Sequence, residues 1–352
     1  MTNRAIVTGS GFAFPESATQ EDLWAGFFKD HYNNSPIARR IFTTAGVRQR
    51  HAVANPIVED VSGLTTAARM TRFLPEAMPL GKESISTALT QAGLDASDIG
   101  LFAVASCTGY ATPGLDILLA RDIGMSDSVQ RLFIGHMGCY AALPALGTVS
   151  DYVIARQRPA LLLCLELTSL HIQPSTNETD QIVSHALFSD AAAALVVQPD
   201  PAPATRPGLE VVDIVAQTDV SASDHMTWDV TDLGFRMGLS ARVPDVLALH
   251  LRNVVDDLLA RNGLSLDDIH GWAVHPGGPR ILDVAGEVLD LKPNNLVESR
   301  ETLANHGNCS SATVLAVLEE VRRHRDLQPG QHVIALAFGP GLTLYATLLR
   351  AV

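Results

Sequence analysis

The sequence has few cysteines, a shortage of positive charge and no long apolar run. Its four cysteines include no CxxC pair, which argues against a zinc site or a disulfide framework. Lys and Arg number 25 against 38 Asp and Glu, and the net charge of −13 argues against nucleic-acid binding. No apolar run reaches the ~20 residues of a membrane span, and the N-terminal segment lacks the pattern of a signal peptide. We therefore expect a soluble, cytoplasmic protein with no membrane span and no metal.

The composition that remains is typical of a globular protein with two units. Hydrophobic residues make up 47 % of the 352 residues and charged residues 18 %. A chain of this length exceeds what one hydrophobic core usually spans. Residues 199–208, rich in proline and alanine, have the composition of a linker. We place the domain boundary there, between an N-terminal half of residues 1–200 and a C-terminal half of residues 201–352.

Short apolar runs alternate with helical patterns along the whole chain, which predicts a mixed α/β fold. The expected strands are Ala5–Thr8, Leu101–Ala105, Leu132–Ile134, Ala160–Leu165, Ala192–Val197, Leu209–Ala216, Trp272–Val274, His332–Phe338 and Thr343–Leu349. The expected helices include Ser84–Ala92, Ala141–Ala155, Asp245–Arg261, Arg280–Leu289 and Ser311–Arg323.

The two halves resemble one another in sequence. Leu89–Gly109 and Leu259–Gly278 both read as a helix end, a Gly-Leu pair, an Asp-containing turn and an apolar strand. Further along, a glycine precedes Cys139 in the first half and Asn308 in the second, and a helical pattern follows each. The first match has an offset of 170 residues and the second an offset of 169. This agreement predicts an internal duplication whose paired sheets share one core.

Cys139 is a candidate nucleophile because it opens a predicted helix directly after a glycine. A thiol at a helix N-terminus lies near unpaired N–H groups and a partial positive charge, so we expect a lowered pKa. Gly138 would permit the tight turn that presents the sulfur. The alternative is a buried structural cysteine.

His275 and Asn308 are the candidate partners of Cys139. His275 ends an apolar strand and precedes a Gly/Pro-rich turn, so its ring can project into a cleft. Asn308 occupies the position in the second half that Cys139 occupies in the first, and its amide could donate to an oxyanion. Asn308 could equally be an ordinary helix cap. Together the three residue types fit acyl transfer.

Positive charge gathers in one segment of this acidic chain. Residues 37–51 contain no acidic residue and four arginines: Arg39, Arg40, Arg48 and Arg50. Such a segment is either a solvated helix face or a dock for a phosphorylated carrier, because arginine recognises phosphate well.

Four ordered motifs resemble those of type III polyketide synthases, the chalcone-synthase-like enzymes on the thiolase fold. They are GCYAAL at 138–143, HPGGPRILD at 275–283, GNCSSA at 307–312 and FGPGLT at 338–343. The resemblance covers nearly the whole chain. It implies an internally duplicated αβαβα layered architecture and an acyltransferase that needs no cofactor beyond its coenzyme A thioester substrates.

The resemblance also implies a role for each of the three candidate residues. Cys139 would carry the starter acyl group and then the growing chain, and His275 would keep it ionised. His275 and Asn308 would polarise the thioester carbonyl of malonyl-CoA, so that decarboxylation leaves a stabilised enolate. Repeated condensation would precede cyclisation, and the expected product is an alkylpyrone or a small resorcinol.

Residues of the gate and pocket follow from the same resemblance. Phe188 matches the gatekeeping Phe between the coenzyme A tunnel and the cavity, and Met237 stands where a second gatekeeping Phe is common. Trp228 falls where plant enzymes have a cavity-lining Gly, and it either fills the cavity or points into the core. The other implied pocket residues are Cys107, Thr108, Thr168, His171 and Ser310.

The resemblance also has implications for substrates and assembly. Arg40 matches a basic residue that contacts coenzyme A phosphate, whereas Ile37 and Thr44 replace the flanking lysines of the plant pattern. The family is dimeric, which implies a homodimer that binds acyl-CoA and malonyl-CoA. Two alternatives are a β-ketoacyl-(acyl carrier protein) synthase III, which performs one condensation, and a non-catalytic scaffold on the same fold.

Overall fold

A computed structural model describes residues 3–199 and 208–352. Its largest element is a nine-stranded mixed sheet with the order β11-β12-β13-β8-β1-β7-β6-β4-β5. These strands are β1 (Ile6–Ala13), β4 (Leu101–Ala105), β5 (Gln130–Ile134), β6 (Ala160–Glu166), β7 (Ala191–Gln198), β8 (Leu209–Thr218), β11 (Ile269–Val274), β12 (His332–Gly339) and β13 (Thr343–Ala351). Eight of the nine predicted strands fall within one of them, and the ninth, Ala5–Thr8, begins one residue before β1.

The sheet has two parts with matching topology. The order β1-β7-β6-β4 of the first part corresponds to the order β8-β13-β12-β11 of the second, and the first part carries one further strand, β5, parallel to β4 at its edge. Among the four corresponding strands of each part, the last pair is parallel and the other pairs are antiparallel. Within the sheet the two parts meet at β1 and β8, where Ile6 lies opposite Glu210 and Val7 opposite Leu209. The matching order agrees with the duplication predicted from the sequence.

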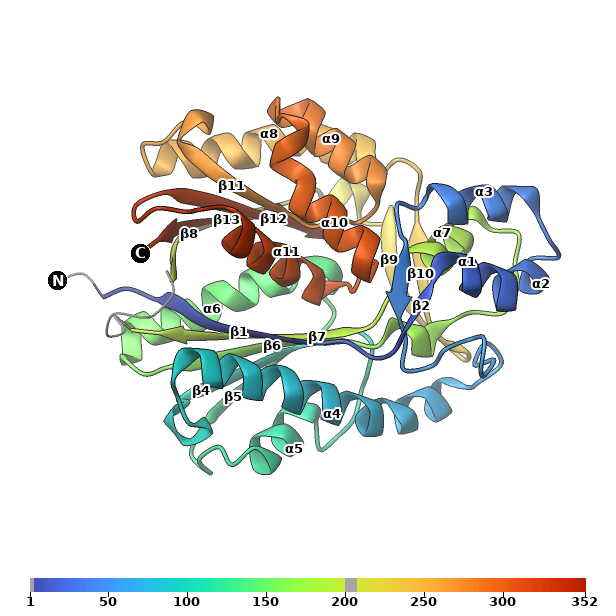
Figure 1. Cartoon of the computed structure of the whole chain (residues 1–352), viewed down its shortest axis with the longest axis horizontal. Coiled ribbons are helices and arrows are strands. Elements are labelled where there is room, and N and C mark those ends of the chain that lie inside the picture. The colour runs from blue at the N-terminus through green and yellow to red at the C-terminus, as the bar shows by residue number, and fades with distance from the viewer. Residues whose placement is uncertain (1–2, 200–207) are drawn as a thin grey trace.

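Helices and sheet form five layers (Figure 1). The inner layer consists of α6 (Ala142–Arg156) and α11 (Ser311–His324), which share one buried apolar cluster with both parts of the sheet. Helices α4 (Thr66–Ala92) and α5 (Leu115–Asp122) cover the outer face of the first part, and α8 (Val243–Arg261) and α9 (Pro279–Leu289) cover that of the second. The predicted α/β, internally duplicated αβαβα fold is confirmed.

Helix α4 is longer than the predicted segment Ser84–Ala92. It begins at Thr66 and includes Pro75 and Pro79, which are unusual inside a helix. Two glycines of β1 allow it to pack directly on the sheet. A Cβ atom at Gly9 would lie 2.1 Å from the carbonyl oxygen of Ala88, and one at Gly11 would lie 2.0 Å from that of Ser84. Packing against β1 therefore stabilises α4 although its two prolines disfavour a helix locally.

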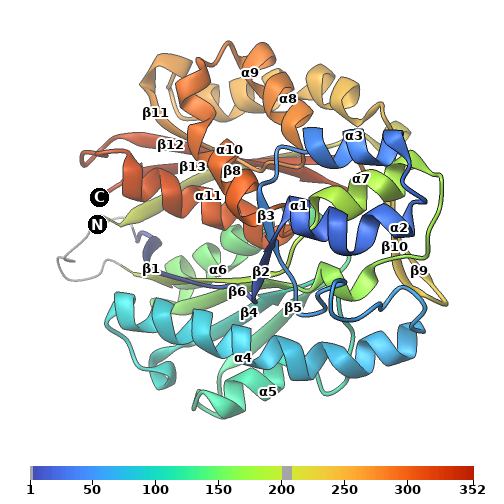
Figure 2. The same ribbon diagram turned by 45° about the vertical axis from the view of Figure 1, so that its right-hand side comes forward.

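The remaining elements gather at one end of the layers (Figure 2). They are α1 (Gln20–Leu23), α2 (Lys29–His31), α3 (Pro36–Thr44), α7 (Thr179–Leu187), the short pair β2 (Ser17–Thr19) and β3 (Gln49–His51), and the hairpin of β9 (Met226–Thr231) and β10 (Gly234–Leu239). Helix α10 (Val297–His306) precedes α11. Residues 200–207 of the predicted linker lie outside the described residues.

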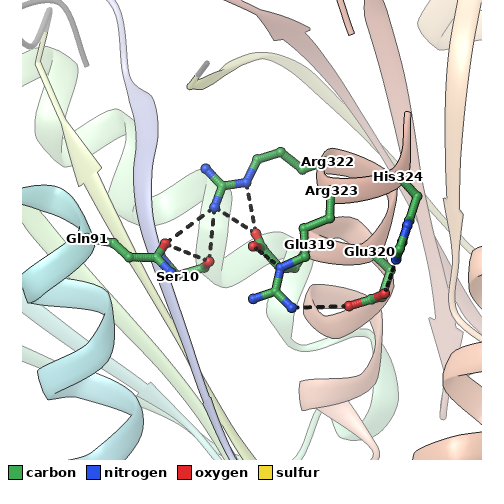
Figure 3. A network of polar contacts seen from close by, with 7 residues as sticks. All are labelled: Ser10, Gln91, Glu319, Glu320, Arg322, Arg323 and His324. Atoms are coloured by element: carbon green, nitrogen blue, oxygen red, sulfur yellow. Dashed lines mark hydrogen bonds and ion pairs between the residues drawn. The ribbon is translucent and has the colours of Figure 1, made fainter. Parts of the chain in front are cut away.

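A polar network ties α11 to the first half of the chain (Figure 3). Glu319 is buried and accepts hydrogen bonds from Arg322 and Arg323, both at 2.8 Å. Arg322 reaches on to Ser10 Oγ on β1, at 3.2 Å, and to Gln91 Oε1 on α4, at 3.4 Å. The contact between α11, β1 and α4 therefore leaves the buried Glu319 charge compensated, whereas loss of its arginine partners would leave that charge buried and unpaired.

Candidate active site

Cys139 lies in a 3₁₀ turn, Gly138–Tyr140, between β5 and α6. Gly138 has a φ of +70°, and a Cβ atom there would lie 3.0 Å from Pro340 Cδ. Only a glycine adopts this conformation without strain, so it fixes the turn that presents the sulfur. Cys139 itself is 6 % exposed. The position at the start of a helix is as predicted, with one 3₁₀ turn before α6 begins.

The pKa of Cys139 differs from the prediction. Burial raises it to about 12, although the side chains of Ser310 and Asn308 act in the opposite direction. Desolvation of a thiolate thus outweighs the favourable helix end. The net shift is upward, opposite to the lowered pKa expected from the sequence.

His275 directly follows β11 and is fully buried. Among the described residues, no group forms a hydrogen bond with Nδ1 or Nε2, so the expected contact with Cys139 is absent. Burial lowers the pKa of His275 to about 3, and the ring packs edge-on against Phe338 at 5.6 Å. A neutral imidazole with two unpartnered nitrogens is therefore available to a ligand.

Asn308 is held between α10 and α11 by its backbone and side chain. Its N–H donates to Leu187 O at 2.8 Å, and its carbonyl accepts from Ser189 N at 3.0 Å. The side-chain Oδ1 accepts from Ser310 N at 2.9 Å. This bond orients the amide and leaves the Nδ2 hydrogens for another acceptor, such as Cys139 or a ligand.

All three candidate residues line one cavity of about 380 Å³, here called the main cavity. Its walls come from α3, α7, β10 and the starts of α8 and α9, with Phe338 of β12. The structure therefore brings Cys139, His275 and Asn308 together from three distant parts of the chain.

Phe188 and Met237 separate the main cavity from two smaller spaces. The inner pocket, about 20 Å³, is lined by Cys139 and Pro340 together with predicted residues, namely Cys107, Thr108, Thr168, Trp228 and Ser310. The side chamber, about 40 Å³, lies between α1, β3, α7 and β10. Phe188 and Met237 line all three spaces, and their role as a gate stays a prediction.

Trp228 lies in the wall of these spaces and does not point only into the core. It is opposite Met237 in the β9–β10 hairpin and lines both the inner pocket and the side chamber. Its Nε1 donates to Cys107 O at 2.8 Å, which fixes the indole over the pocket.

His171 braces the side chamber instead of the inner pocket. Its Nε2–H donates to Thr108 O at 2.7 Å, and its Nδ1 accepts from Phe235 N at 2.9 Å. Burial lowers the pKa of His171 to about 4. The neutral ring, stacked on Phe235 at 4.5 Å, is thus fully engaged within the protein.

Glu166 is a buried carboxyl group that the sequence reasoning missed. It ends β6 and accepts hydrogen bonds from Cys107 N at 3.0 Å, Thr108 Oγ1 at 2.8 Å and Ser311 Oγ at 2.6 Å. Burial raises its pKa, while these hydrogen bonds act to lower it. Glu166 orients two residues of the inner pocket, Cys107 and Thr108. The sequence feature that could have identified it is a charged residue at the end of an otherwise apolar strand.

The predicted arginines do not form one cluster. Arg39 pairs with Glu21 at 2.6 Å, and Arg48 pairs with Glu301 at 2.5 Å. Arg50, in contrast, is 8 % exposed and lines the side chamber. Its position inside β3, where the guanidinium donates to Gln20 Oε1 and to the carbonyl of Phe188, takes it away from any surface dock.

Arg40 is the exposed arginine of this segment for which no ion pair is found among the described residues. The main cavity itself is lined by another arginine, Arg280 at the start of α9, which the sequence reasoning did not select. Arg280 is largely exposed and pairs with Glu287 at 3.0 Å. The sequence feature that could have identified Arg280 is its place five positions after His275, the candidate catalytic histidine.

In residues 3–199 and 208–352, no group of three His, Cys, Asp or Glu side chains is arranged to hold a metal ion. Nor does that part of the chain contain a helix with the length and apolar character needed to cross a membrane.

Comparisons with known proteins agree with this geometry. Residues 2–201 match the family model for the N-terminal domain of chalcone and stilbene synthases, and residues 211–352 match that for the C-terminal domain. A 1,3,6,8-tetrahydroxynaphthalene synthase of Streptomyces peucetius subsp. caesius is 38 % identical over 89 % of this chain and 83 % of its own. The alpha-pyrone synthesis polyketide synthase-like Pks18 of Mycobacterium tuberculosis is 30 % identical over 99 % of this chain and 91 % of its own.

Solved structures show the same similarity in three dimensions. PKS-I of the brown alga Ectocarpus siliculosus superposes with a TM-score of 0.93 at 27 % identity, over 100 % of this chain and 99 % of its own. The 1,3,6,8-tetrahydroxynaphthalene synthase of Streptomyces coelicolor A3(2) superposes with a TM-score of 0.89 at 28 % identity, over 98 % and 99 %. The comparisons thus favour repeated condensation over the single-condensation and scaffold alternatives. The chain belongs to the chalcone and stilbene synthase family and is a type III polyketide synthase, an acyltransferase on the thiolase fold.

Proposed function

We propose that Cys139 is acylated by an acyl-CoA starter and then holds the growing chain. As the sulfur attacks the thioester carbonyl, the thiol proton passes to a ring nitrogen of His275. The bond between the carbonyl carbon and the coenzyme A sulfur then breaks, and coenzyme A leaves with that proton. The observation that carries the proposal is the shared main cavity, which is lined by Cys139 and by a His275 whose two ring nitrogens have no partner among the described residues.

A raised thiol pKa is compatible with this sequence of events. Cys139 and His275 are both neutral at rest, so proton transfer accompanies attack and is not completed before it. A buried neutral pair also avoids the cost of holding two separated charges in a dry site. The thiolate of Cys139 therefore forms only as its sulfur attacks the carbonyl of a bound thioester.

Extension uses malonyl-CoA in the same cavity. A protonated ring nitrogen of His275 and the Nδ2 hydrogens of Asn308 donate to the malonyl thioester oxygen, where negative charge develops as CO₂ leaves. The resulting enolate carbon attacks the acyl–Cys139 carbonyl, and the bond to sulfur breaks. The product is a coenzyme A thioester longer by two carbons, which acylates Cys139 again.

Arg40 and Arg280 are the proposed docking residues for coenzyme A phosphates. Arg280 lines the main cavity, and Arg40 lies on α3 next to Ile41, which also lines it. Arginine is well suited to this role because its planar guanidinium binds phosphate through two parallel hydrogen bonds. Arg39 and Arg48 are engaged with the carboxylates of Glu21 and Glu301, which offset their charge.

The proposed product is an alkylpyrone or a small resorcinol formed from an aliphatic starter with few extensions. The inner pocket has room for very little because the Trp228 indole occupies its wall. Met237 at the gate is a flexible thioether that adapts to varied acyl chains. The homodimer, the cytoplasmic location, the absence of a cofactor and the division into domains 1–200 and 201–352 stay predictions.

Mass spectrometry of products from a panel of acyl-CoA starters with malonyl-CoA tests the proposal. We expect pyrones or resorcinols two or three units longer than an aliphatic starter, and none when malonyl-CoA is omitted. A parallel reaction with malonyl carrier protein separates the two possible donors. Products that carry a single added unit, formed only with the carrier protein, would contradict repeated condensation from malonyl-CoA.

A further inference from the structure

Ser184 lies at the junction of the main cavity and the side chamber. Three residues line both spaces: Ser184, Phe188 and Met237. Ser184 is one helical turn before Phe188 at the end of α7, so the two side chains lie on the same face of the helix. Of the three, Ser184 alone has a polar side chain.

The Ser184 side chain is largely buried, and its hydroxyl is not engaged by the described part of the protein. The residue is 8 % exposed, and among the residues that the structure describes none forms a hydrogen bond with its Oγ. Of the neighbouring polar groups of the side chamber, Ser169 Oγ donates to Asp190 at 2.5 Å and Gln173 Nε2 donates to the carbonyl of His171 at 3.0 Å. Arg50 Nη2, in contrast, is buried without a hydrogen-bond partner among the described residues and offers the chamber a second, cationic donor. A buried hydroxyl that faces a cavity without a protein partner is suited to a polar ligand.

The side chamber is small. Its volume of about 40 Å³ holds about three water-sized groups. Two carbons and one oxygen, the size of a single ketide unit, fit that space. The aromatic rings of Trp228 and Phe235 flank it, which favours a flat, conjugated group over a bulky one.

We propose that the side chamber is a binding subsite for one β-keto unit of the growing chain, whose oxygen bonds to Ser184 Oγ. The hydroxyl donates to the oxygen in its keto form and accepts from it in its enol form. Binding there draws the distal end of the chain past Phe188 and Met237, which delays cyclisation until another unit is added. This inference rests on the proposed function, because it assigns a place to the intermediate of that reaction.

Ser184→Ala removes the hydroxyl and little volume, so it tests the bond itself. We expect the ratio of longer to shorter products to fall roughly 3- to 10-fold, the effect of one hydrogen bond. Ser184→Thr keeps a hydroxyl and should restore at least part of the ratio. The matched control is Ser150→Ala, since Ser150 is a buried serine on α6 whose Oγ is also without a partner and which lines none of the three spaces.

The product ratio of the control should equal that of the wild type. An unchanged ratio in Ser184→Ala overturns the inference, as does an equal fall of all products or the same change in Ser150→Ala. These outcomes leave the proposed function intact. A wild-type protein that forms no extended product from malonyl-CoA contradicts the proposed function instead, so the two failures are distinguishable.

Discussion

Replacement of Trp228 should lengthen the product. The indole lies across from Met237 and forms a wall shared by the inner pocket and the side chamber. Trp228→Ala removes this wall, so the two spaces, about 20 and 40 Å³, join around the volume that the indole leaves. We expect products longer by at least one two-carbon unit from the same aliphatic starter.

The substitution should cost stability without unfolding the protein. Loss of a well-packed Trp costs roughly 3–5 kcal/mol, and Trp228 should cost the lower end, because it is only half-buried and faces two cavities. About 1 kcal/mol of this is the hydrogen bond from Nε1 to Cys107 O. Trp228→Phe keeps most of the ring area and should give an intermediate product length.

Trp272 provides the control. It is 2 % exposed on β11, belongs to the core of the second half and lines none of the three spaces. Trp272→Phe should lower the midpoint of thermal unfolding and leave product lengths unchanged, as measured by liquid chromatography and mass spectrometry. A folded Trp228→Ala protein with the wild-type product profile would refute the claim that the indole limits the chain.

We make three further predictions, two for residues of the main cavity and one for the polar network of α11. Asn308→Ala should slow malonyl-CoA decarboxylation roughly 100- to 1000-fold and slow acylation of Cys139 much less; equal slowing in stopped-flow assays would leave Asn308 a mere helix cap. Charge reversal at Arg280 should raise the KM for acyl-CoA but not for short pantetheine thioesters, and an equal rise for both would exclude phosphate docking. Burial acts to raise the pKa of Glu319, but the hydrogen bond and charge of Arg322 outweigh it and the net pKa is lowered. The carboxylate therefore stabilises the fold above its unfolded pKa of about 4.3, and this contribution is lost as the pH falls through the lowered value. In urea unfolding, Glu319→Gln should cost roughly 1.5–3 kcal/mol at pH 7 and progressively less below pH 4; a cost that does not depend on pH would contradict the ionic role.

Most strands of the main sheet could be predicted because nearly all their residues, except in the more exposed β5 and the second half of β8, are buried. Their apolar runs, such as LLLCLE in β6, are therefore almost uninterrupted. The hairpin of β9 and β10 was missed because polar and charged residues alternate with its apolar ones, as in Met226–Thr231. Most of α4 was missed because its two prolines are local breakers, whereas packing on the glycines of β1 decides its structure.

Some residues of the candidate site could be predicted from the sequence, and others could not. Cys139, His275 and Asn308 could be selected because each follows or precedes a glycine-rich turn at a comparable place in the two halves. The degree to which each side chain is buried could not be predicted from the sequence. Burial raises the pKa of Cys139, and burial of Arg50 removes it from the surface where a phosphate would dock. Arg280 and Ser184 matter only through the cavities that they line, which depend on segments distant in sequence.

The central claim is that Cys139 forms the acyl-enzyme. Intact-protein mass spectrometry after brief incubation with an acyl-CoA starter, without malonyl-CoA, measures this directly. The wild-type protein should gain the mass of one acyl group, with the adduct mapped by peptide analysis to Cys139 and not to Cys107, Cys164 or Cys309. Cys139→Ala should gain no mass and form no product. An acyl adduct on another residue, or wild-type product formation by Cys139→Ala, would contradict the account.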